Sequence, residues 1–537
     1  MIRSIHLLAI ALLAGSAVSQ STFQLAFGPP VTSGAYVLTR AVRHTDDSWT
    51  VRAGSMTART MLHLNPQGEA QWNLTYNSSD LMTYSHIACT APGPANSTIL
   101  LFGDTVHEIG GGQSRRHFGL ARIGSSGQVI WSRRYSYYLP VTIPYPSSPH
   151  ALAVAADGRI FAHTGEPSLS GIMCFLANGD PLWASGLSDP AGVVGGFTLV
   201  ADEAGGCFYL NGQDQVDTNS VMVGHLDGEG ALIWNRRYRS AVSGRTLYPQ
   251  HMSRTMEGGL LITAAEFDPS VGLITLLIRL SGTGDELWTN TYWSDANGPL
   301  TPFRAVERPD GGAWVLVDRF GYGFLGTNAQ GEVEQAVRYT YREVGNITHV
   351  VQIFELFVHQ NELCAVANYV MDHTWPGQDQ VTYLLWKLDA AEPVLCGAEP
   401  FTVTRIPGAD LATTTNTTAA DFTISELPFA LGSITATDIP TQPFCDLYVG
   451  VEAHAGVPAF SLAPSVIERG GSCTVTSTEH ATLELVDGTG KLVRGGVQLL
   501  PGAPLTMTTA GYALGLYLIR AVGPDGRVLG AIRLLIQ

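Results

Sequence analysis

Charged side chains are scarce in this sequence, at 14% of 537 residues, where globular proteins carry about a quarter. Lysine is almost missing and occurs only as Lys387 and Lys491. With 30 basic and 46 acidic residues, the formal net charge is −16. A surface that binds nucleic acid must neutralise phosphates with a basic face, so this composition argues against a nucleic-acid partner.

Long hydrophobic runs are also missing. The N-terminus has a short one, in which Arg3 supplies positive charge, residues 6–14 are apolar, and Ala17–Ser19 fits a small-residue cleavage site. This pattern predicts a signal peptide at residues 1–19, with an uncleaved anchor as the alternative. A helix needs about 20 apolar residues to span a bilayer, and a second apolar run breaks at Arg279. We therefore expect an exported protein with no transmembrane segment in the mature chain.

Cysteine is infrequent, with seven residues, so at least one thiol stays unpaired. No spacing resembles a zinc site or a Cys-x-x-Cys redox motif. Several cysteines lie within apolar, strand-like runs, which favours buried and inert thiols. Cys396 and Cys445 bound a segment of different composition, and an exported compartment permits disulfides. A disulfide between these two is one hypothesis, and two unrelated thiols are the other.

Sequence signatures of catalysis are missing as well. There is no His-Glu-x-x-His, Gly-x-Ser-x-Gly or Gly-x-x-x-x-Gly-Lys motif. Residues 211–217 and 225–230 are rich in oxygen-bearing side chains but lack the spacing of a calcium loop, and turn chemistry explains them. The sequence therefore predicts no catalytic residue, no cofactor and no assigned metal site.

What the sequence does have is a recurring phrase, seen most clearly as GALIWNRRY at residues 230–238. Each copy has a turn glycine, three residues, Trp, three more residues and, in most copies, Tyr. Side chains alternate along a strand, so the Trp and the Tyr share one face, and we expect the Trp to pack between neighbouring repeats. Further copies lie at 68–76, 127–135, 179–187 and 284–292, with a degenerate copy at 331–339.

Two other strand patterns complete each repeat. One follows a turn and occurs in seven copies, such as residues 257–265, and the other precedes the Trp phrase. The tryptophans of successive phrases are 51 to 59 residues apart, so four strands recur about every fifty residues. This spacing is typical of a β-propeller, whereas a sandwich array needs units of about 100 residues. We predict an all-β fold with a seven-bladed β-propeller at residues 20–395, within a range of six to eight blades.

The two ends of the repeat array complement each other. The last repeat, residues 360–397, lacks a clear Trp strand, whereas residues 22–28 resemble an isolated one, with Phe23 in the Trp place and Phe27 in the Tyr place. We predict that this N-terminal strand completes the seventh blade. Without such closure, the first and last blades would expose unpaired strand edges.

The composition changes after the propeller. Residues 396–454 are rich in Thr and Ala and lack a Trp phrase, which predicts a Thr-rich linker or a small β-module. Residues 455–537 return to a β pattern. One hairpin is expected at 481–496, around an Asp-Gly turn, and a second at 506–536.

This C-terminal stretch resembles the type A sorting domain of the type IX secretion system of Bacteroidetes. The matching segments are LELVDGTGKLV, GLYLIRA and GRVLGAIRLLI, in that order, over about 75 residues. The family usually begins with a Pro-Asn-Pro turn, where this chain has APSVIERGGS. The resemblance implies a β-sandwich-like domain that engages the type IX machinery. It also implies passage through the periplasm, followed by secretion or display at the outer-membrane surface.

Histidine recurs near the start of the predicted innermost strand of four repeats, as His86, His150, His251 and His349. Equivalent positions in different blades converge on the propeller axis, so these imidazoles can surround one mouth of the channel. Neutral imidazole is a common ligand for transition metals. The alternative is a structural role in hydrogen bonding the loops, and Phe197 and Phe303 near the same phase favour it.

Two classes of function remain open. The first is a non-enzymatic secreted or surface protein whose propeller binds a glycan, polymer or protein. The aromatic loops at 135–149 and 370–380 favour this class. The second is an enzyme built on a propeller. It could be similar to the quinone-dependent dehydrogenases, whose repeat the Trp phrase also resembles, or it could act on polysaccharide. No set of cofactor partners can be assigned in the sequence, and we favour binding.

Overall fold

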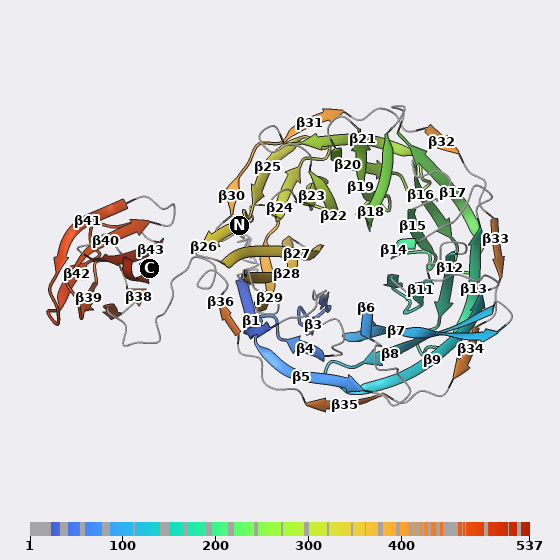
Figure 1. The fold of residues 1–537 in the computed structure, drawn as a ribbon, viewed down its shortest axis with the longest axis horizontal. Helices are drawn as coiled ribbons and strands as arrows, with labels where there is room; N and C mark the ends of the chain where they lie inside the picture. Colours follow the sequence, from blue (N-terminus) through green and yellow to red (C-terminus); the bar gives the residue numbers. More distant parts are fainter. Residues whose placement is uncertain are drawn as a thin grey trace, which may run out of the picture. The chain divides into compact units, whose positions relative to one another are not determined.

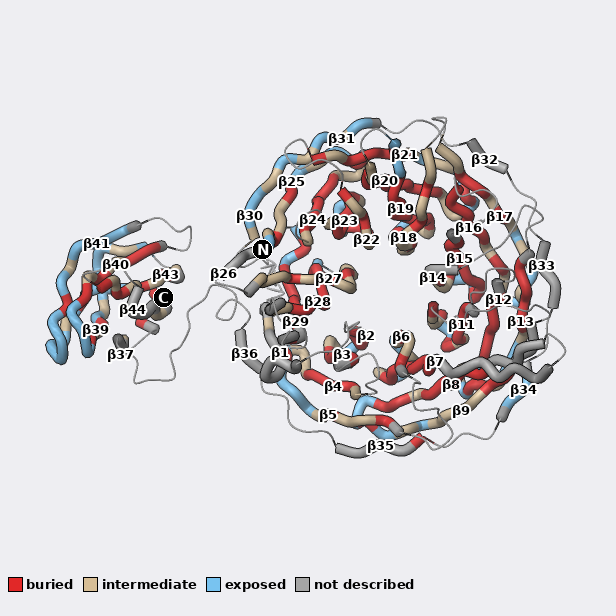
Figure 2. Tube along the Cα trace, viewed as in Figure 1, coloured by how far each residue is buried: buried red, intermediate tan, exposed pale blue. Residues whose placement is uncertain are grey.

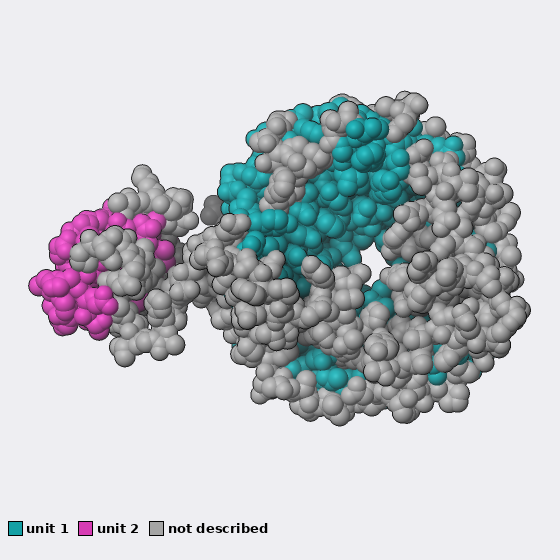
Figure 3. All heavy atoms as spheres, viewed as in Figure 1, with its two compact units in different colours: residues 1–444 teal, residues 445–537 magenta. Residues whose placement is uncertain are grey.

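The computed structural model separates into two compact units, residues 1–444 and residues 445–537, each described here by itself (Figure 3). The structure describes residues 23–32, 41–53, 60–77, 86–110, 113–139, 151–164, 170–188, 196–212, 220–240, 245–269, 272–294, 300–318, 322–344, 347–359, 361–373, 380–391, 393, 398–407, 412–414, 418–421, 424–427, 431–435, 441–443, 460–463, 466–467, 469–487, 492–513, 515–523 and 528–536. The predicted signal peptide lies outside these residues. All the described elements are strands, and the described residues contain no helix able to span a membrane.

The described strands of unit 1 form seven antiparallel sheets around a common centre, as expected for an all-β, propeller-like repeat fold (Figure 1). Six sheets are built from four consecutive strands plus one strand from a distant segment. The consecutive strands are β2 (Ala41–Arg43), β3 (Trp49–Ala53), β4 (Thr60–Leu64) and β5 (Ala70–Asn77); β6 (His86–Gly93), β7 (Ser97–Gly110), β8 (Gln113–Ile123) and β9 (Val129–Leu139); β10 (Ala151–Val154), β11 (Ile160–Thr164), β12 (Ser170–Phe175) and β13 (Pro181–Ser188); β14 (Gly196–Ala201), β15 (Cys207–Gly212), β16 (Ser220–Leu226) and β17 (Leu232–Arg239); β18 (Thr246–Arg254), β19 (Leu260–Asp268), β20 (Gly272–Leu280) and β21 (Glu286–Trp293); β22 (Thr301–Glu307), β23 (Ala313–Asp318), β24 (Tyr322–Thr327) and β25 (Val333–Arg338).

The remaining sheet joins the two ends of the repeat array. It contains β26 (Arg342–Val344), β27 (Ile347–His359), β28 (Glu362–His373) and β29 (Gln380–Asp389), followed by the N-terminal strand β1 (Phe23–Thr32). β1 pairs antiparallel with β29, and Phe23 lies opposite Lys387. The predicted closure by the N-terminal strand is therefore confirmed.

Each Trp phrase links its own sheet to the turn that begins the next phrase. The indole Nε1 of Trp131 donates to the carbonyl of Ala177 at 3.1 Å, and the Tyr135 hydroxyl donates to the carbonyl of Gly179 at 2.5 Å. The same pattern repeats at Trp72, Trp183, Trp234 and Trp288, and at Tyr76, Tyr238 and Tyr292. The tryptophans are half-buried and these tyrosines fully buried. The Trp phrase thus packs between sheets as predicted, with the Tyr as its most buried member.

The apolar core lies between neighbouring sheets, and the buried residues concentrate toward the inner strands (Figure 2). One cluster joins Phe118 of β8 to Phe175 of β12, for example, and another joins Val223 of β16 to Ile262 of β19. Because each sheet packs on two neighbours, its strands carry apolar residues on both faces. This explains the nearly continuous apolar runs, such as β20.

The Thr-rich segment differs from its prediction as a linker or a small module. Its residues 399–443 form seven short strands that pair, in reverse order around the ring, with the outermost strand of every sheet (Figure 1). These strands are β30 (Glu399–Pro400) on β25, β31 (Thr404–Pro407) on β21, β32 (Ala412–Thr414) on β17, β33 (Thr418–Asp421) on β13, β34 (Ile424–Leu427) on β9, β35 (Gly432–Thr435) on β5 and β36 (Thr441–Pro443) on β1. Each covers a strand edge that would otherwise be open.

Unit 2 contains two sheets around a single core. A three-stranded sheet is made of β37 (Phe460–Ala463), β39 (Ser472–Ser477) and β42 (Leu505–Thr508). A five-stranded sheet has the order β38 (Val466–Ile467), β44 (Val528–Ile536), β43 (Gly515–Val522), β40 (Ala481–Asp487) and β41 (Leu492–Leu499). Val475 of the first sheet and Leu483 of the second belong to the same buried cluster. The three segments that carry the sorting-domain resemblance form neighbouring strands of the larger sheet.

Candidate functional site

In five sheets, the strand that lines the axis has an irregularity that sets the positions of side chains there. β6, β14, β18, β22 and β27 each shift register by one residue against the next strand. Such a bulge inserts one extra residue and re-aims the side chains beside it. The residue directly after the shift is Cys89, Thr198, His251, Arg304 or Glu355. The register therefore gives these five side chains equivalent places around the axis.

All five residues line one axial cavity of about 450 Å³. This volume lies within the range of about 300–1,000 Å³ that small-molecule sites occupy. Its walls come from strands of six sheets, and about half of the lining residues are apolar. The apolar lining is Cys89, Ala151, Leu152, Leu199, Val200, Met252, Val306, Leu356 and Phe357.

Three polar side chains from neighbouring strands meet in this cavity. Nη1 of Arg304 lies 3.3 Å from Nε2 of His251 and 3.7 Å from Oε1 of Glu355. The other carboxylate oxygen of Glu355 accepts a hydrogen bond from the backbone N–H of Ala41, at 2.7 Å. Both charged side chains are largely buried, with 17% and 15% of their surface exposed.

The protonation of His251 follows from its neighbour. A guanidinium is always charged and only donates, so Nε2 of His251 accepts, and the imidazole in this contact is neutral. The cluster therefore combines one positive group, one negative group and one neutral group. Its net charge is close to zero, and it presents donors and acceptors side by side in a cavity of mixed polar and apolar lining.

The described members of the predicted histidine set lie at different positions along their strands. His251 lies in the axial layer, but His349 is six residues before Glu355 on β27, about 20 Å along the strand at 3.3 Å per residue. Nδ1 of His349 is hydrogen bonded to the hydroxyl of Tyr369. The backbone of His86 pairs with Gly103, before the bulge of β6, and His150 lies outside the described residues. Within the described part of the chain, no group of three metal-binding side chains is placed to hold a metal ion.

Sequence reasoning missed Arg304 and Glu355. One signal was available, because His251 and Arg304 are both seven residues before a Gly-Gly turn, at Gly258 and Gly311. Aligning the repeats on that turn places both residues in one column. The strand that carries Glu355 has no such turn, so its place depends on the bulge, which the sequence does not reveal.

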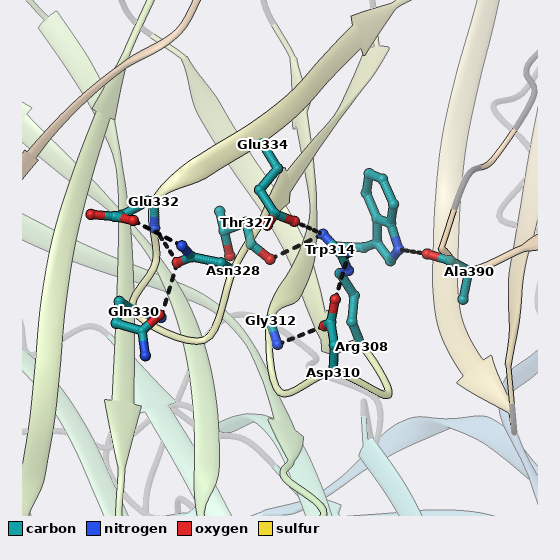
Figure 4. Close-up of polar contacts among 10 residues, drawn as sticks. All are labelled: Arg308, Asp310, Gly312, Trp314, Thr327, Asn328, Gln330, Glu332, Glu334 and Ala390. Carbon is teal, nitrogen blue, oxygen red and sulfur yellow. Dashed lines mark hydrogen bonds and ion pairs between the residues drawn. The ribbon is translucent and has the colours of Figure 1, made fainter.

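A second polar cluster, near the turn between β22 and β23, has a structural role (Figure 4). Arg308 pairs with Asp310 at 2.7 Å and with Glu334 at 2.6 Å, and its guanidinium lies over the Trp314 ring. The indole of Trp314 donates to the carbonyl of Ala390 at 2.8 Å, which joins this sheet to the closing one. These contacts hold the turn and the Trp314 ring in place beside a cavity of about 410 Å³.

The described cysteines are structural. Cys89, Cys174, Cys207, Cys364 and Cys473 are buried, as expected for inert thiols. Burial raises the pKa of the Cys174 and Cys364 thiols to about 12, so both stay protonated near neutral pH. Cys396 and Cys445, the hypothetical disulfide, lie outside the described residues.

Comparison with known proteins reveals only distant likenesses. No protein-family model matches the sequence, and no curated protein matches it either. Among solved structures, the chain is similar to a protein of unknown function from Bacteroides caccae, with 12% identity, 50% of this chain and 93% of that chain covered, and a TM-score of 0.30. It is also similar to a protein from Lactobacillus plantarum (12% identity, 76% and 99% covered, TM-score 0.34) and to a gluconolactonase from Xanthomonas campestris (12% identity, 59% and 90% covered, TM-score 0.29). The function therefore rests on this chain's own residues.

Proposed function

We propose that unit 1 is a seven-bladed β-propeller that binds a neutral, polyhydroxylated ligand of saccharide type in its axial cavity, and that unit 2 directs export of the protein by type IX secretion. The observation that carries the binding proposal is the Arg304–Glu355 pair in a cavity of ligand size. The seven sheets of the described residues, closed by β1, support the blade number.

The ligand class follows from the chemistry of the pair. A guanidinium only donates hydrogen bonds and an ionised carboxylate only accepts them, whereas a hydroxyl group does both. Two adjacent hydroxyls can therefore accept from Arg304 and donate to Glu355 at the same time. A free anion would be repelled by Glu355 and a free cation by Arg304, so a neutral polyol suits both groups better than either ion. Arg254, the other charged residue of the lining, pairs with Glu203 at 3.3 Å.

The apolar part of the lining favours the same ligand. A sugar ring has hydroxyls at its edge and C–H groups on its faces, and those faces can lie against the half-buried Leu152, Val200 and Phe357. The cavity volume is suited to a mono- or disaccharide. His251 adds an imidazole beside Arg304, whose orientation it helps to hold.

The cavity favours binding over hydrolysis. Hydrolysis of a glycosidic bond generally uses two carboxyl groups on opposite sides of that bond, about 5–9.5 Å apart. Glu355 is the one carboxylate among the described residues that line the cavity. The second candidate is an enzyme acting on polysaccharide, or a dehydrogenase similar to the quinone-dependent propellers.

Export rests on the C-terminal unit. The segments that resemble the sorting domain are adjacent strands of one sheet in a separate unit, as expected for a sorting domain that folds and is recognised by itself. Deleting residues 455–537 should leave the protein in the periplasm, while the full chain reaches the medium or the cell surface. Equal export of both forms would refute the sorting role.

Titration calorimetry with the full mature chain tests the binding site. We expect neutral mono- or disaccharides to bind, and the matching sugar acids and amino sugars to bind at least tenfold more weakly. If only charged ligands bind, the ligand class is wrong. If no ligand in a panel of neutral and charged saccharides binds, the cavity is not a saccharide site.

A further inference from the structure

Residues 399–443, called the strap from here on, form a feature that the binding proposal does not use. The strap runs once around the ring against the direction of the blades and adds one strand to each sheet, from β30 on β25 to β36 on β1 (Figure 1). Unit 2 begins directly after it, at residue 445. Any force on the C-terminal end of the chain therefore reaches the ring through β36.

The strap is held more weakly than the sheets beneath it. Its strands are two to four residues long, whereas the outer strands that they pair with are six to eleven residues long. Proline ends three of them, at Pro400, Pro407 and Pro443, and removes a backbone donor each time. The hydrogen-bonded pairing between each strap strand and its sheet is thus short, and it can open without disturbing the pairing on the neighbouring sheet.

The strap side chains that the structure describes make both apolar and polar contacts with the sheets; Arg405, for example, donates to Oδ1 of Asn290 at 2.7 Å. Leu431 is buried, and Phe401 and Val403 are half-buried against the core. Glu426 pairs with Arg133 at 2.7 Å and Glu399 with Arg338 at 3.4 Å, and about half of each carboxylate side chain is exposed. Exposed ion pairs contribute little to stability and are screened by salt.

Closure of the ring does not depend on the strap. β1 pairs with β29 over most of its length, on the side opposite β36. Several apolar clusters consist of blade residues alone, whereas Leu431, Phe401 and Val403 of the strap pack in or against two others. Removing the strap therefore opens outer edges but leaves the ring and its axial cavity assembled.

We propose that the strap is an extensible tether. Tension on the C-terminal end releases β36 first and then β35, β34 and the others in turn, while the ring stays closed. About 45 residues at about 3.3–3.6 Å each give a reach of roughly 150–160 Å. In a protein held at a surface by its C-terminal end, which rests on the proposed export, this reach lets the bound propeller move under load without unfolding.

Force spectroscopy on the purified full chain tests the tether independently of ligand and export. One handle is attached through a bio-orthogonal amino acid at exposed Gln67, in the turn between β4 and β5, and the other at the C-terminus. We expect several small, reversible extensions at low force that add up to about 150 Å, followed by larger events as the sheets unfold. Unfolding of a sheet before these extensions would overturn the proposal.

A pair of facing serines supplies the matched variant. Ser425 of β34 lies directly opposite Ser136 of β9, so the double substitution Ser425→Cys and Ser136→Cys places two thiols at cross-strand distance. The oxidised form should stop peeling at β34, leaving about 16 residues free and reducing the extension to roughly 50–60 Å. Reduction should restore the full length. The same extension in both redox states would show that the steps do not come from the strap.

Discussion

Gly284 gives the sharpest test of how the sheets are joined. Its φ is +80°, which L side chains rarely adopt, and a Cβ at this position would lie 2.9 Å from Cζ3 of Trp234 on the preceding sheet. Gly258, in another turn of the same sheet, has a φ of +81°, and the nearest group to its Cβ is the end of the Arg254 side chain, at 3.6 Å. The two glycines therefore differ in the contact with Trp234 and share the same backbone strain.

The strain of a left-handed alanine costs about 1–2 kcal/mol, and overpacking adds about 1–3 kcal/mol. We expect Gly258→Ala to lower the free energy of unfolding by about 1–2 kcal/mol, and Gly284→Ala to lower it by roughly 2–5 kcal/mol. Urea denaturation followed by tryptophan fluorescence measures both. Adding Trp234→Ala to Gly284→Ala should remove the overpacking part, so that the two substitutions are not additive. Equal effects of the two glycine substitutions would refute the tight contact between sheets.

Three further predictions concern pH, thiols and closure. Burial first, and then the neighbouring His63, lower the pKa of His44 to about 4, so the folded state keeps this imidazole neutral. The unfolded state binds the extra proton below its ordinary pKa of about 6.5, so the contribution of His44 to stability should be constant above that pH and fall by on the order of 3 kcal/mol between pH 6.5 and 4. Burial lowers the pKa of His63 as well, so a His44→Gln variant should lose the His44 part of the pH dependence and keep the rest; an identical pH profile would contradict the assignment. Cys174 and Cys364 should react with a thiol reagent at pH 8 only after denaturation, and labelling of either in the native protein would show that its burial is wrong. Deleting residues 20–30 removes most of β1 from β29 and should lower the melting temperature sharply, whereas an unchanged melt would contradict closure by this strand.

The repeat fold could be read from the sequence because its signals are periodic. The Trp phrase recurs at nearly constant spacing and marks one outer strand per sheet, and Phe23 and Phe27 mark the displaced copy that closes the ring. These signals depend on local alternation and on turn glycines, which a single sequence displays directly.

The strap could not be read in the same way. Strands of two to four residues, such as β30 and β36, are too short to show any alternation, and they form only because a sheet edge is already present. The residues of the axial site could not be predicted for a related reason. A one-residue bulge in β18, β22 and β27 decides which side chains face the axis. Histidines chosen by sequence phase therefore fall at different heights, while Arg304 and Glu355 meet.

The central claim is that Arg304 and Glu355 together hold a neutral saccharide. Titration calorimetry on Arg304→Gln, Glu355→Gln and the double variant tests it most directly, with Arg338→Gln at the ring's outer edge as the control. Hydrogen bonds to charged groups contribute about 1.5–3 kcal/mol, so each single substitution should weaken binding by about 10- to 100-fold. The double variant should lose less than the two singles combined, because both residues hold the same pair of hydroxyls. Unchanged affinity in both single variants would contradict the account.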